Sequence, residues 1–325
     1  MNIATRLFLN ECKKRGIETK SVSKNKIFKL SHKKHYEYLY AQFFSITTAT
    51  ARLICSRKEM TKDFLSSAGI YVAEGGSFNP TQLDEALKLA ENRYPVVLKP
   101  SPGGHGDGVF ANIINPKALK LAWVKLTQHG SSNFILEKRF EGKEYRILST
   151  RDKVLGVIHR IPAHVTGDGE TTISKLINEK NSDPRRSDNT GDPVVKIFID
   201  DIVIDNLKKQ GLKLNSMPKA GKRVYLRENS NVSTGGESID YTEKIHPSIT
   251  KLAIKIIRSI PGLPYGGIDI MTKDITKEQK DGDYIVIEVN SSPGIDLHHF
   301  PYKGKKRNVA GQIVNLVFPE TTPLP

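Results

Sequence analysis

The sequence predicts a mixed protein of the α+β or α/β class, folded into two or three lobes. Its 325 residues are enough to bury a substantial core. Hydrophobic residues make up 38% of the chain and charged residues 26%, which is typical of a globular protein in water. Short apolar runs, which favour strands, alternate with segments whose apolar residues recur at helical spacing.

Helices are predicted where apolar residues recur every three to four positions. Residues 1–20 form such a segment, which ends at Gly16. A second helix is predicted to begin at Ser56, because Ser56 and Glu59 have the spacing of a capping box. The other predicted helices cover residues 81–92, 172–180, 202–210, 248–260 and 309–318.

Strands are predicted from short apolar runs that polar or glycine-rich segments bound. Residues 36–53 are compatible with either helix or extended chain, and residues 165–170 are predicted to form a turn. The long polar stretch 181–237 indicates an insertion between core strands. The predicted strands cover residues 27–30, 94–100, 134–138, 144–148, 154–160, 223–226, 266–271 and 284–287.

Two of the predicted strands carry oxygen-bearing side chains. Glu288 and Asn290 follow the apolar run 284–287 and are two residues apart, so both side chains point to one face of a strand. Asp269 lies among apolar residues in the preceding strand. The alternative interpretation is that these acidic residues simply meet solvent at strand ends. We favour a magnesium site, because carboxylate and amide oxygens are the ligands that hard cations prefer.

A glycine-rich loop follows the predicted strand 94–100, which places Lys99 at its end. Glycines without side chains let backbone N–H groups turn toward an anion. The loop therefore predicts a phosphate-binding site, although its spacing differs from that of the known nucleotide-binding fingerprints and a simple hairpin turn would have similar glycines. The glycines of this loop are Gly103, Gly104, Gly106 and Gly108.

The net charge of +15 implies an attraction for polyanions or acidic substrates, unless it belongs to an ordinary lysine-rich surface. The lysines are scattered, so we do not expect a nucleic-acid partner. No apolar run is long enough to span a bilayer, and no secretion signal begins the chain, so we expect no membrane partner. Cys12 and Cys55 are expected to be free thiols in a reducing cytoplasm.

Six motifs in a fixed order resemble those of the ATP-grasp superfamily of carboxylate–amine ligases. The segments 160–169, 183–186, 231–236 and 301–308 are most similar to the ATP-grasp module of cyanophycin synthetases, with the module of bifunctional glutathione synthetases close behind. The six motifs are KEMTK at Lys58, PVVLKP at Lys99, the glycine loop, ILEK at Glu137, GIDIM at Asp269 and IEVNSSPG at Glu288.

The resemblance implies an ATP-grasp fold, in which two α+β lobes grip ATP. Residues 56–318 would form this domain, with a central lobe of about 56–135, a C-terminal lobe of about 136–318 and the insertion 181–237. Residues 1–55 would form a short preceding region. The implied cofactors are ATP and Mg²⁺, with Mn²⁺ as the alternative.

Residue roles follow from matching positions in the family. Lys58 and Lys99 would contact phosphates, and Glu144 would hold the ribose. The glycine loop with His105 would cover the phosphates. Glu137 and Lys138 lie where the adenine-binding hinge of the family lies, and Asp269, Glu288 and Asn290 match its metal ligands.

The implied reaction activates a carboxylate as an acyl phosphate, which an amine then attacks. Arg160 is the candidate cation for the oxyanion; its alternative is a surface ion pair. D-alanine ligases carry an arginine where this chain has Gly267, so the cation must come from elsewhere. Weaker candidates for substrate contact are Arg146, His164, Ser233, His298 and Arg307.

The predicted function is therefore ATP-dependent amide formation between a carboxylate and an amine, each from an amino acid or short peptide, with an acidic substrate favoured. The alternatives are an enzyme that modifies an acidic precursor peptide and an ATP-binding module without catalysis. Because the region before the ATP-grasp motifs is short and no Mur-ligase-like domain follows, we do not expect cyanophycin synthesis by this chain alone. We expect a homo-oligomer in which a partner subunit completes the substrate cleft.

Overall fold

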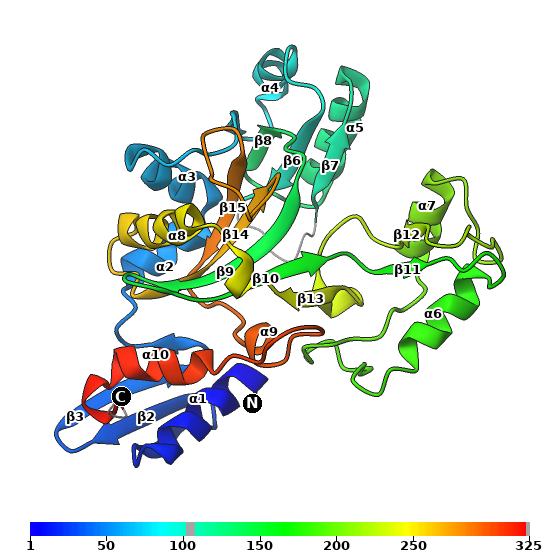
Figure 1. Ribbon diagram of the computed structural model, residues 1–325. Helices are drawn as coiled ribbons and strands as arrows, with labels where there is room; N and C mark the ends of the chain where they lie inside the picture. The colour runs from blue at the N-terminus through cyan, green and yellow to red at the C-terminus, as the bar shows by residue number, and fades with distance from the viewer. Residues whose placement is uncertain (102–107, 323–325) are drawn as a thin grey trace.

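A central antiparallel sheet organises the computed structural model, which describes residues 1–101 and 108–322. Figure 1 shows three parts attached to this sheet: an upper lobe, a lateral extension that contains α6 and α7, and a lower part that contains both termini. Helix α8 (Pro247–Ser259) packs against one face of the sheet. The sheet has the order β13 (Glu237–Asp240), β10 (Val154–Ile161), β9 (Lys143–Thr150), β14 (Tyr265–Thr272) and β15 (Tyr284–Asn290).

The upper lobe is a second antiparallel sheet covered by two helices (Figure 1). Trp123, Phe134 and Leu136 lie in its core and bury most of their apolar surface there. The sheet has the order β5 (Gly75–Phe78), β8 (Phe134–Lys138), β6 (Val96–Pro100) and β7 (Phe110–Ile113), and the helices are α4 (Leu83–Ala90) and α5 (Pro116–Gln128).

The lower part joins the two ends of the described chain. Helix α1 (Ile3–Lys14) packs on α10 (Val309–Val317), and Phe8 is completely buried between them and the small N-terminal sheet. Gly16, with φ +68°, ends the first helix as predicted. The sheet is a meander of β1 (Glu18–Ser23), β2 (Ile27–His32), β3 (His35–Tyr40) and β4 (Phe43–Phe44).

The lateral extension has a core of its own, in which Ile177, Val203 and Val224 are buried. The predicted turn at 165–170 is partly wrong. Val165 and Thr166 belong to a strand that pairs with residues 223–225, and the turn begins at Gly167. The extension contains β11 (His164–Thr166), α6 (Ile173–Asn181), α7 (Asp201–Lys209) and β12 (Arg223–Tyr225).

The capping box predicted at Ser56 is wrong. Ser56 ends helix α2 (Ala49–Ser56) and donates to the Leu53 carbonyl, whereas α3 (Lys58–Ser67) begins after Arg57 without a side-chain cap of its own. Ser101 supplies the missing acceptor: its Oγ lies 3.3 Å from the Lys58 backbone nitrogen and donates to Glu59 at 2.5 Å. A residue from the upper lobe thus caps the helix that carries Lys58.

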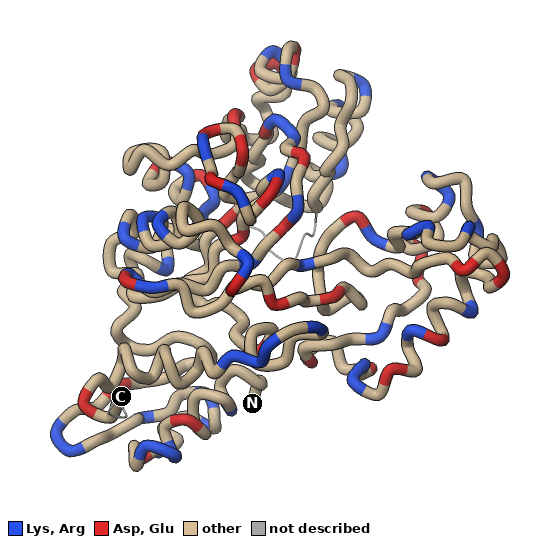
Figure 2. Tube along the Cα trace, in the orientation of Figure 1, with Lys and Arg blue, Asp and Glu red and all other residues tan. Residues whose placement is uncertain are grey.

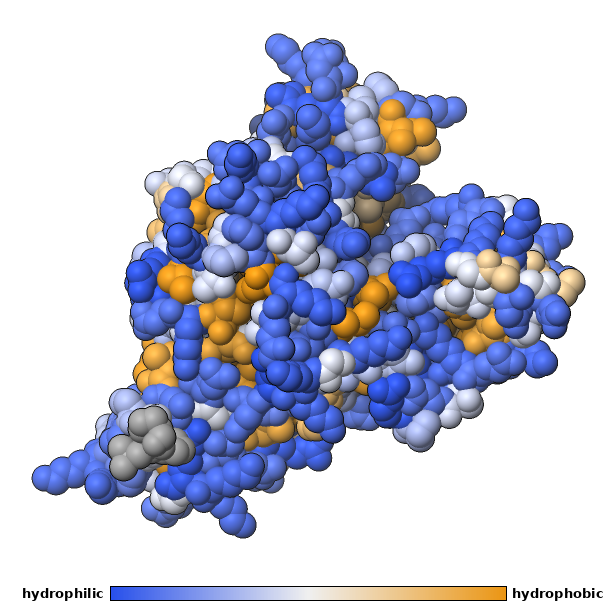
Figure 3. Space-filling model, viewed as in Figure 1, coloured by the Kyte–Doolittle hydropathy of each residue, from blue (hydrophilic) through white to orange (hydrophobic). Residues whose placement is uncertain are grey.

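Charged side chains of both signs are interspersed along the chain (Figure 2). In the space-filling view the surface is mainly hydrophilic and is hollowed between the upper lobe and the lateral extension (Figure 3). None of the helices in the described part of the chain is long and apolar enough to cross a membrane.

Candidate active site

One face of the central sheet carries five charged side chains that we call the acid–arginine cluster. Asp269 of β14 lies directly opposite Arg146 of β9 on one side and Glu288 of β15 on the other. Directly opposed residues of neighbouring strands point to the same face, so these side chains converge. The cluster consists of Glu144, Arg146, Arg160, Asp269 and Glu288.

A β-bulge in β15 places Glu288 on this face. Asp269 pairs with Glu288, but the next residue, Ile270, pairs with Val286, so Ile287 is an additional residue in β15. Val286 therefore remains in the apolar core while Glu288 faces Asp269. Asn290 lies two residues further on, and its amide donates to the Glu288 carboxylate at 3.0 Å. The prediction that Glu288 and Asn290 share one face is confirmed.

Asp269 is the most buried member of the cluster, with 3% of its side chain exposed. Arg146 forms two hydrogen bonds with its carboxylate, one of them 2.8 Å long, and Arg160 Nη2 donates to the same carboxylate at 2.8 Å. Burial alone would raise the pKa of Asp269, but the two arginines outweigh it and hold the pKa well below its ordinary value. Asp269 is therefore an anion held by two fixed cations.

Arg160 also pairs with Glu144, so it bridges two carboxylates. Arg146 occupies the space beside Gly267: a Cβ at Gly267 would lie 3.2 Å from Arg146 Cδ and 2.7 Å from Pro293 Cβ. An arginine of β9 therefore lies beside the glycine of β14. Sequence analysis named Arg160 as the candidate cation, and the structure brings both Arg146 and Arg160 to the Asp269 carboxylate.

The predicted phosphate lysines come from the upper lobe and from α3. Lys99 Nζ lies 2.6 Å from Glu137, and Lys62 Nζ lies 2.9 Å from the other oxygen of the same carboxylate. Burial alone would raise the pKa of Glu137, but Lys99 and Lys62 keep it below its ordinary value. Glu137 is buried between these lysines, whereas the neighbouring Lys138 is exposed.

Lys58, at the start of α3, is affected by charges of both the upper lobe and the central sheet. Burial lowers the pKa of its ammonium group, while the charge of Glu288 raises it and that of Lys99 lowers it further. Glu288 also acts electrostatically on Arg146. The charges of Glu137 and Lys99, of Lys58 and of the acid–arginine cluster thus act on one another in sequence, and we call them the line of charges. These residues come from seven helices and strands, namely α3, β6, β8, β9, β10, β14 and β15.

Sequence analysis missed Lys62 and Asp296. Lys62 lies one helical turn after Lys58, a spacing that places both on one side of α3, so a helix prediction could have suggested it. Asp296 in α9 (Asp296–His299) acts electrostatically on Arg146, and burial raises its pKa. No local sequence signal pointed to Asp296.

The predicted glycine loop lies largely outside the described residues, namely Gly103, Gly104, His105 and Gly106. Gly108 is described and has a φ of +69°, a backbone conformation that residues other than glycine rarely adopt. It precedes β7 and packs beside Pro100 and Leu126.

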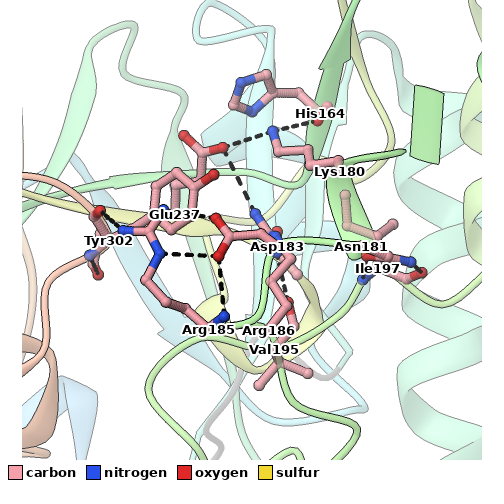
Figure 4. A network of polar contacts seen from close by, with 12 residues as sticks. His164, Lys180, Asn181, Asp183, Arg185, Arg186, Val195, Ile197, Glu237 and Tyr302 are labelled. Atoms are coloured by element: carbon pink, nitrogen blue, oxygen red, sulfur yellow. Dashed lines mark hydrogen bonds and ion pairs between the residues drawn. The ribbon is translucent and has the colours of Figure 1, made fainter. Parts of the chain in front are cut away.

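His164 belongs to a different group of charges, the Lys180 network, defined as His164, Lys180, Arg186 and Glu237 (Figure 4). Glu237 lies opposite Ile161 in the β10–β13 pair, so it points to the opposite face of the sheet from Arg160. Lys180 Nζ lies 2.6 Å from Glu237 and donates to the His164 carbonyl at 2.7 Å. Burial lowers the pKa of His164, and Lys180 lowers it further. The structure does not bring the His164 imidazole to the acid–arginine cluster.

The other predicted substrate contacts have different surroundings. Ser233 lies in a 3₁₀ turn (Val232–Thr234), where its backbone nitrogen donates to the Asn231 side chain. Arg307 forms a two-point ion pair with Asp240, at 2.8 and 2.7 Å. His298 is 1% exposed beneath Gly156 of β10, so it does not reach the surface.

The chain resembles known proteins over nearly its whole length. Residues 215–317 match the model of the RimK-like ATP-grasp domain. A cyanophycin synthetase of Trichormus variabilis is 34% identical over 317 residues, which are 97% of this chain and 35% of that protein. A bifunctional glutathione biosynthesis protein of Clostridium perfringens is 36% identical over an alignment of 329 positions, which covers 98% of this chain and 41% of that protein.

The same similarity extends to a crystal structure, that of a bifunctional glutathione synthetase from Pasteurella multocida. It superimposes with a TM-score of 0.76 at 32% identity and covers 98% of this chain and 44% of that one. This chain therefore spans less than half of the length of each of these relatives. The predicted ATP-grasp fold is confirmed: residues 215–317 match a RimK-like ATP-grasp domain, and nearly the whole chain is similar to one segment of cyanophycin synthetases and bifunctional glutathione synthetases.

Proposed function

We propose that this protein is an ATP-dependent ligase that joins the carboxylate of one amino acid or short peptide to the amine of another. The observation that carries the proposal is the line of charges from Lys99 through Lys58 to Asp269. Phosphoryl transfer depends mainly on positioning and charge neutralisation, which such a line would supply. The catalytic unit would comprise residues 56–318.

In this proposal Lys58 and Lys99 hold the phosphates of ATP. Glu137 fixes Lys99 in place through the 2.6 Å ion pair, so the lysine would not need to reorganise when the nucleotide binds. Burial lowers the pKa of Lys58, and the negative charge of a bound phosphate would raise that pKa. Glu144 would turn from Arg160 to the ribose hydroxyls, and the segment at Glu137 and Lys138 would border the adenine.

The donor chemistry around Glu288 fits Mg²⁺, or Mn²⁺ as the alternative. Glu288 and Asn290 offer hard oxygens on one face, with Asp269 opposite Glu288. Glu288, Asn290 and Asp269 would hold the ion, for which Asp269 must exchange one of its arginine contacts. A bound ion would neutralise phosphate charge during the transfer.

The reaction would proceed in two steps at this face. A carboxylate oxygen attacks the γ-phosphorus of ATP, which gives an acyl phosphate and ADP. The amine nitrogen then attacks the acyl carbon, phosphate leaves, and the nitrogen loses a proton to give the amide. Arg160 and Arg146 would stabilise the oxyanion of this second step, since a guanidinium binds paired oxygens well.

Phosphate release tests the proposal. The protein is incubated with ATP and magnesium and a panel of amino-acid and dipeptide pairs, together with Glu288→Ala and the matched control Glu278→Ala, which removes an exposed glutamate from the β14–β15 connection. We expect release that requires both a carboxylate and an amine, falls by about 10³-fold in Glu288→Ala and is unchanged in Glu278→Ala.

Two outcomes would contradict the proposal. Tight ATP binding without release for any pair would favour an ATP-binding module. Release only with an acidic precursor peptide, measured in a separate arm, would favour the peptide-modifying alternative.

A further inference from the structure

A second hollow borders the predicted metal site. Its volume is about 410 Å³, and it lies between α2, the N-terminal sheet and the turn that follows β15. Asn290 is on its wall, so the hollow opens beside the residues proposed to hold the metal. The lining residues that matter here are Phe43, Arg52, Ser56, Asn290, Ser291 and Ser292.

The N-terminal region is anchored to this hollow by Gln42. The Ser292 hydroxyl donates to Gln42 Oε1 at 2.7 Å, and the Tyr265 hydroxyl donates to the Gln42 carbonyl at 2.5 Å. Tyr265 is completely buried. The segment that leads into Phe43 is thus held against the turn after β15, and Phe43 forms a fixed part of the wall.

Arg52 is the one side chain lining this hollow that carries a charge at neutral pH, among the residues that the structure describes. Its guanidinium lies over the Phe43 ring, 4.2 Å from the ring centroid. No carboxylate of the described chain lies within ion-pair distance of it, unlike Arg146, Arg160 and Arg307. Burial raises the pKa of the Cys55 thiol to about 12, so this neighbour supplies no negative charge.

The hollow therefore combines a cation that has no ion-pair partner in the described chain with neutral hydrogen-bonding groups and the apolar side chains of Phe43, Ala49 and Leu53, a composition that suits the carboxylate and carbon skeleton of an amino acid. We propose that it receives the unreactive carboxylate of the amine-donating amino acid or peptide, with Arg52 as the counter-charge. This inference rests on the proposed function. The carboxylate that becomes an acyl phosphate loses its charge, whereas the carboxylate beside the amine keeps its charge throughout, so a fixed cation fits the latter.

An interaction of this kind binds substrate and transition state equally, so it acts on KM rather than on kcat. The test compares amine donors offered as free amino acids and as the corresponding carboxamides, with the wild type, Arg52→Gln and the control Arg6→Gln. Arg6 is an exposed arginine on α1. We expect Arg52→Gln to raise the KM of the free acids about 10- to 100-fold, with kcat and the carboxamide KM almost unchanged.

The inference is overturned if Arg52→Gln leaves the preference for acids over carboxamides unaltered, or if its effect falls on the carboxylate donor instead. A parallel arm measures binding of the same amino acids by calorimetry with a non-hydrolysable ATP analogue present. If the enzyme turns over and Arg52→Gln leaves KM unaltered, this inference alone is wrong. If binding depends on Arg52 but no pair is turned over, the proposed ligase function is wrong and the carboxylate site is supported. If neither turnover nor Arg52-dependent binding is found, both proposals are wrong.

Discussion

Strand β10 separates two buried charged groups that differ in their surroundings. On one face, the acid–arginine cluster joins side chains of β9, β10, β14 and β15 and continues through Lys58 to the upper lobe. On the other face, the Lys180 network joins α6 and the loop at Arg186 to β13 (Figure 4). Both groups are buried and contain perturbed pKa values. Burial and perturbation alone therefore do not distinguish a reactive site from a structural one.

The position of each group makes the difference. Arg186 has a completely buried side chain that donates to the backbone carbonyls of Val195 and Gly235, and its guanidinium lies 5.1 Å from the Tyr302 ring centroid. It therefore fastens three loops to one another. Asp269, by contrast, collects two arginines beside Glu288, whose charge acts on Lys58. We infer that the Lys180 network attaches the lateral extension, while the acid–arginine cluster performs chemistry.

The largest effect is expected from Asp269→Asn. The substitution removes a proposed metal ligand and weakens the hold on Arg146 and Arg160, so kcat for phosphate release should fall about 10³-fold. Steady-state kinetics and urea denaturation measure the loss of activity and of stability separately. Asp281→Asn, an exposed change between β14 and β15, is the control. Full activity in Asp269→Asn would place the chemistry elsewhere.

Glu237→Gln is expected to reduce stability more than activity. Lys180 and Arg186 would be left buried without their shared anion, which costs about 3 kcal/mol of unfolding free energy, while kcat of the folded protein changes less than about threefold. The control Glu228→Gln breaks the exposed Lys209 pair and should cost at most about 0.5 kcal/mol. An intact fold with activity as low as that of Asp269→Asn would assign the Lys180 network to the active site.

The smallest effect concerns His298, which lies buried near Arg146. Burial, with a further contribution from Arg146, lowers its pKa to about 3. The unfolded state takes up a proton near pH 6.5 and the folded state does not, so the contribution of His298 to stability is complete above that pH and is lost as the pH falls. Between pH 7.5 and 5 this amounts to about 2 kcal/mol.

The measurement is urea denaturation of the wild type and His298→Leu at several pH values. The variant should be less stable at pH 7.5, because the two side chains differ in shape, but its stability should decline less steeply toward pH 5. Parallel pH profiles would show that another group causes the acid sensitivity. His159, whose pKa is also lowered by burial, to about 4, is present in both proteins and cancels in the comparison.

Local patterns were enough for much of the candidate site. Alternation along a strand placed Glu288 and Asn290 on one face, and their hydrogen bond confirms it. The predicted strand at 134–138 coincides with β8, and α1, α8 and α10 lie where apolar periodicity predicted them. Such patterns succeed because they depend only on neighbours along the chain and on which face is apolar.

Other features depended on contacts between distant segments. Ser56 has the sequence of a helix cap, yet Ser101 caps α3, because the upper lobe brings its hydroxyl to Lys58 and Glu59. Helix α1 finds its partner in α10, at the other end of the described chain. Local sequence patterns cannot predict these contacts, since each forms only when segments distant in the sequence have packed together.

The sequence by itself determined the segments that carry the chemistry: an acidic residue in each of two apolar strands, a lysine at the end of a third and a second lysine at the start of a helix. The tertiary structure alone decided how they meet. The bulge at Ile287 aims Glu288 at Asp269, and Gly267 leaves the space that Arg146 fills. Strand register and side-chain volume set these contacts, and both are properties of packed neighbours rather than of any single segment.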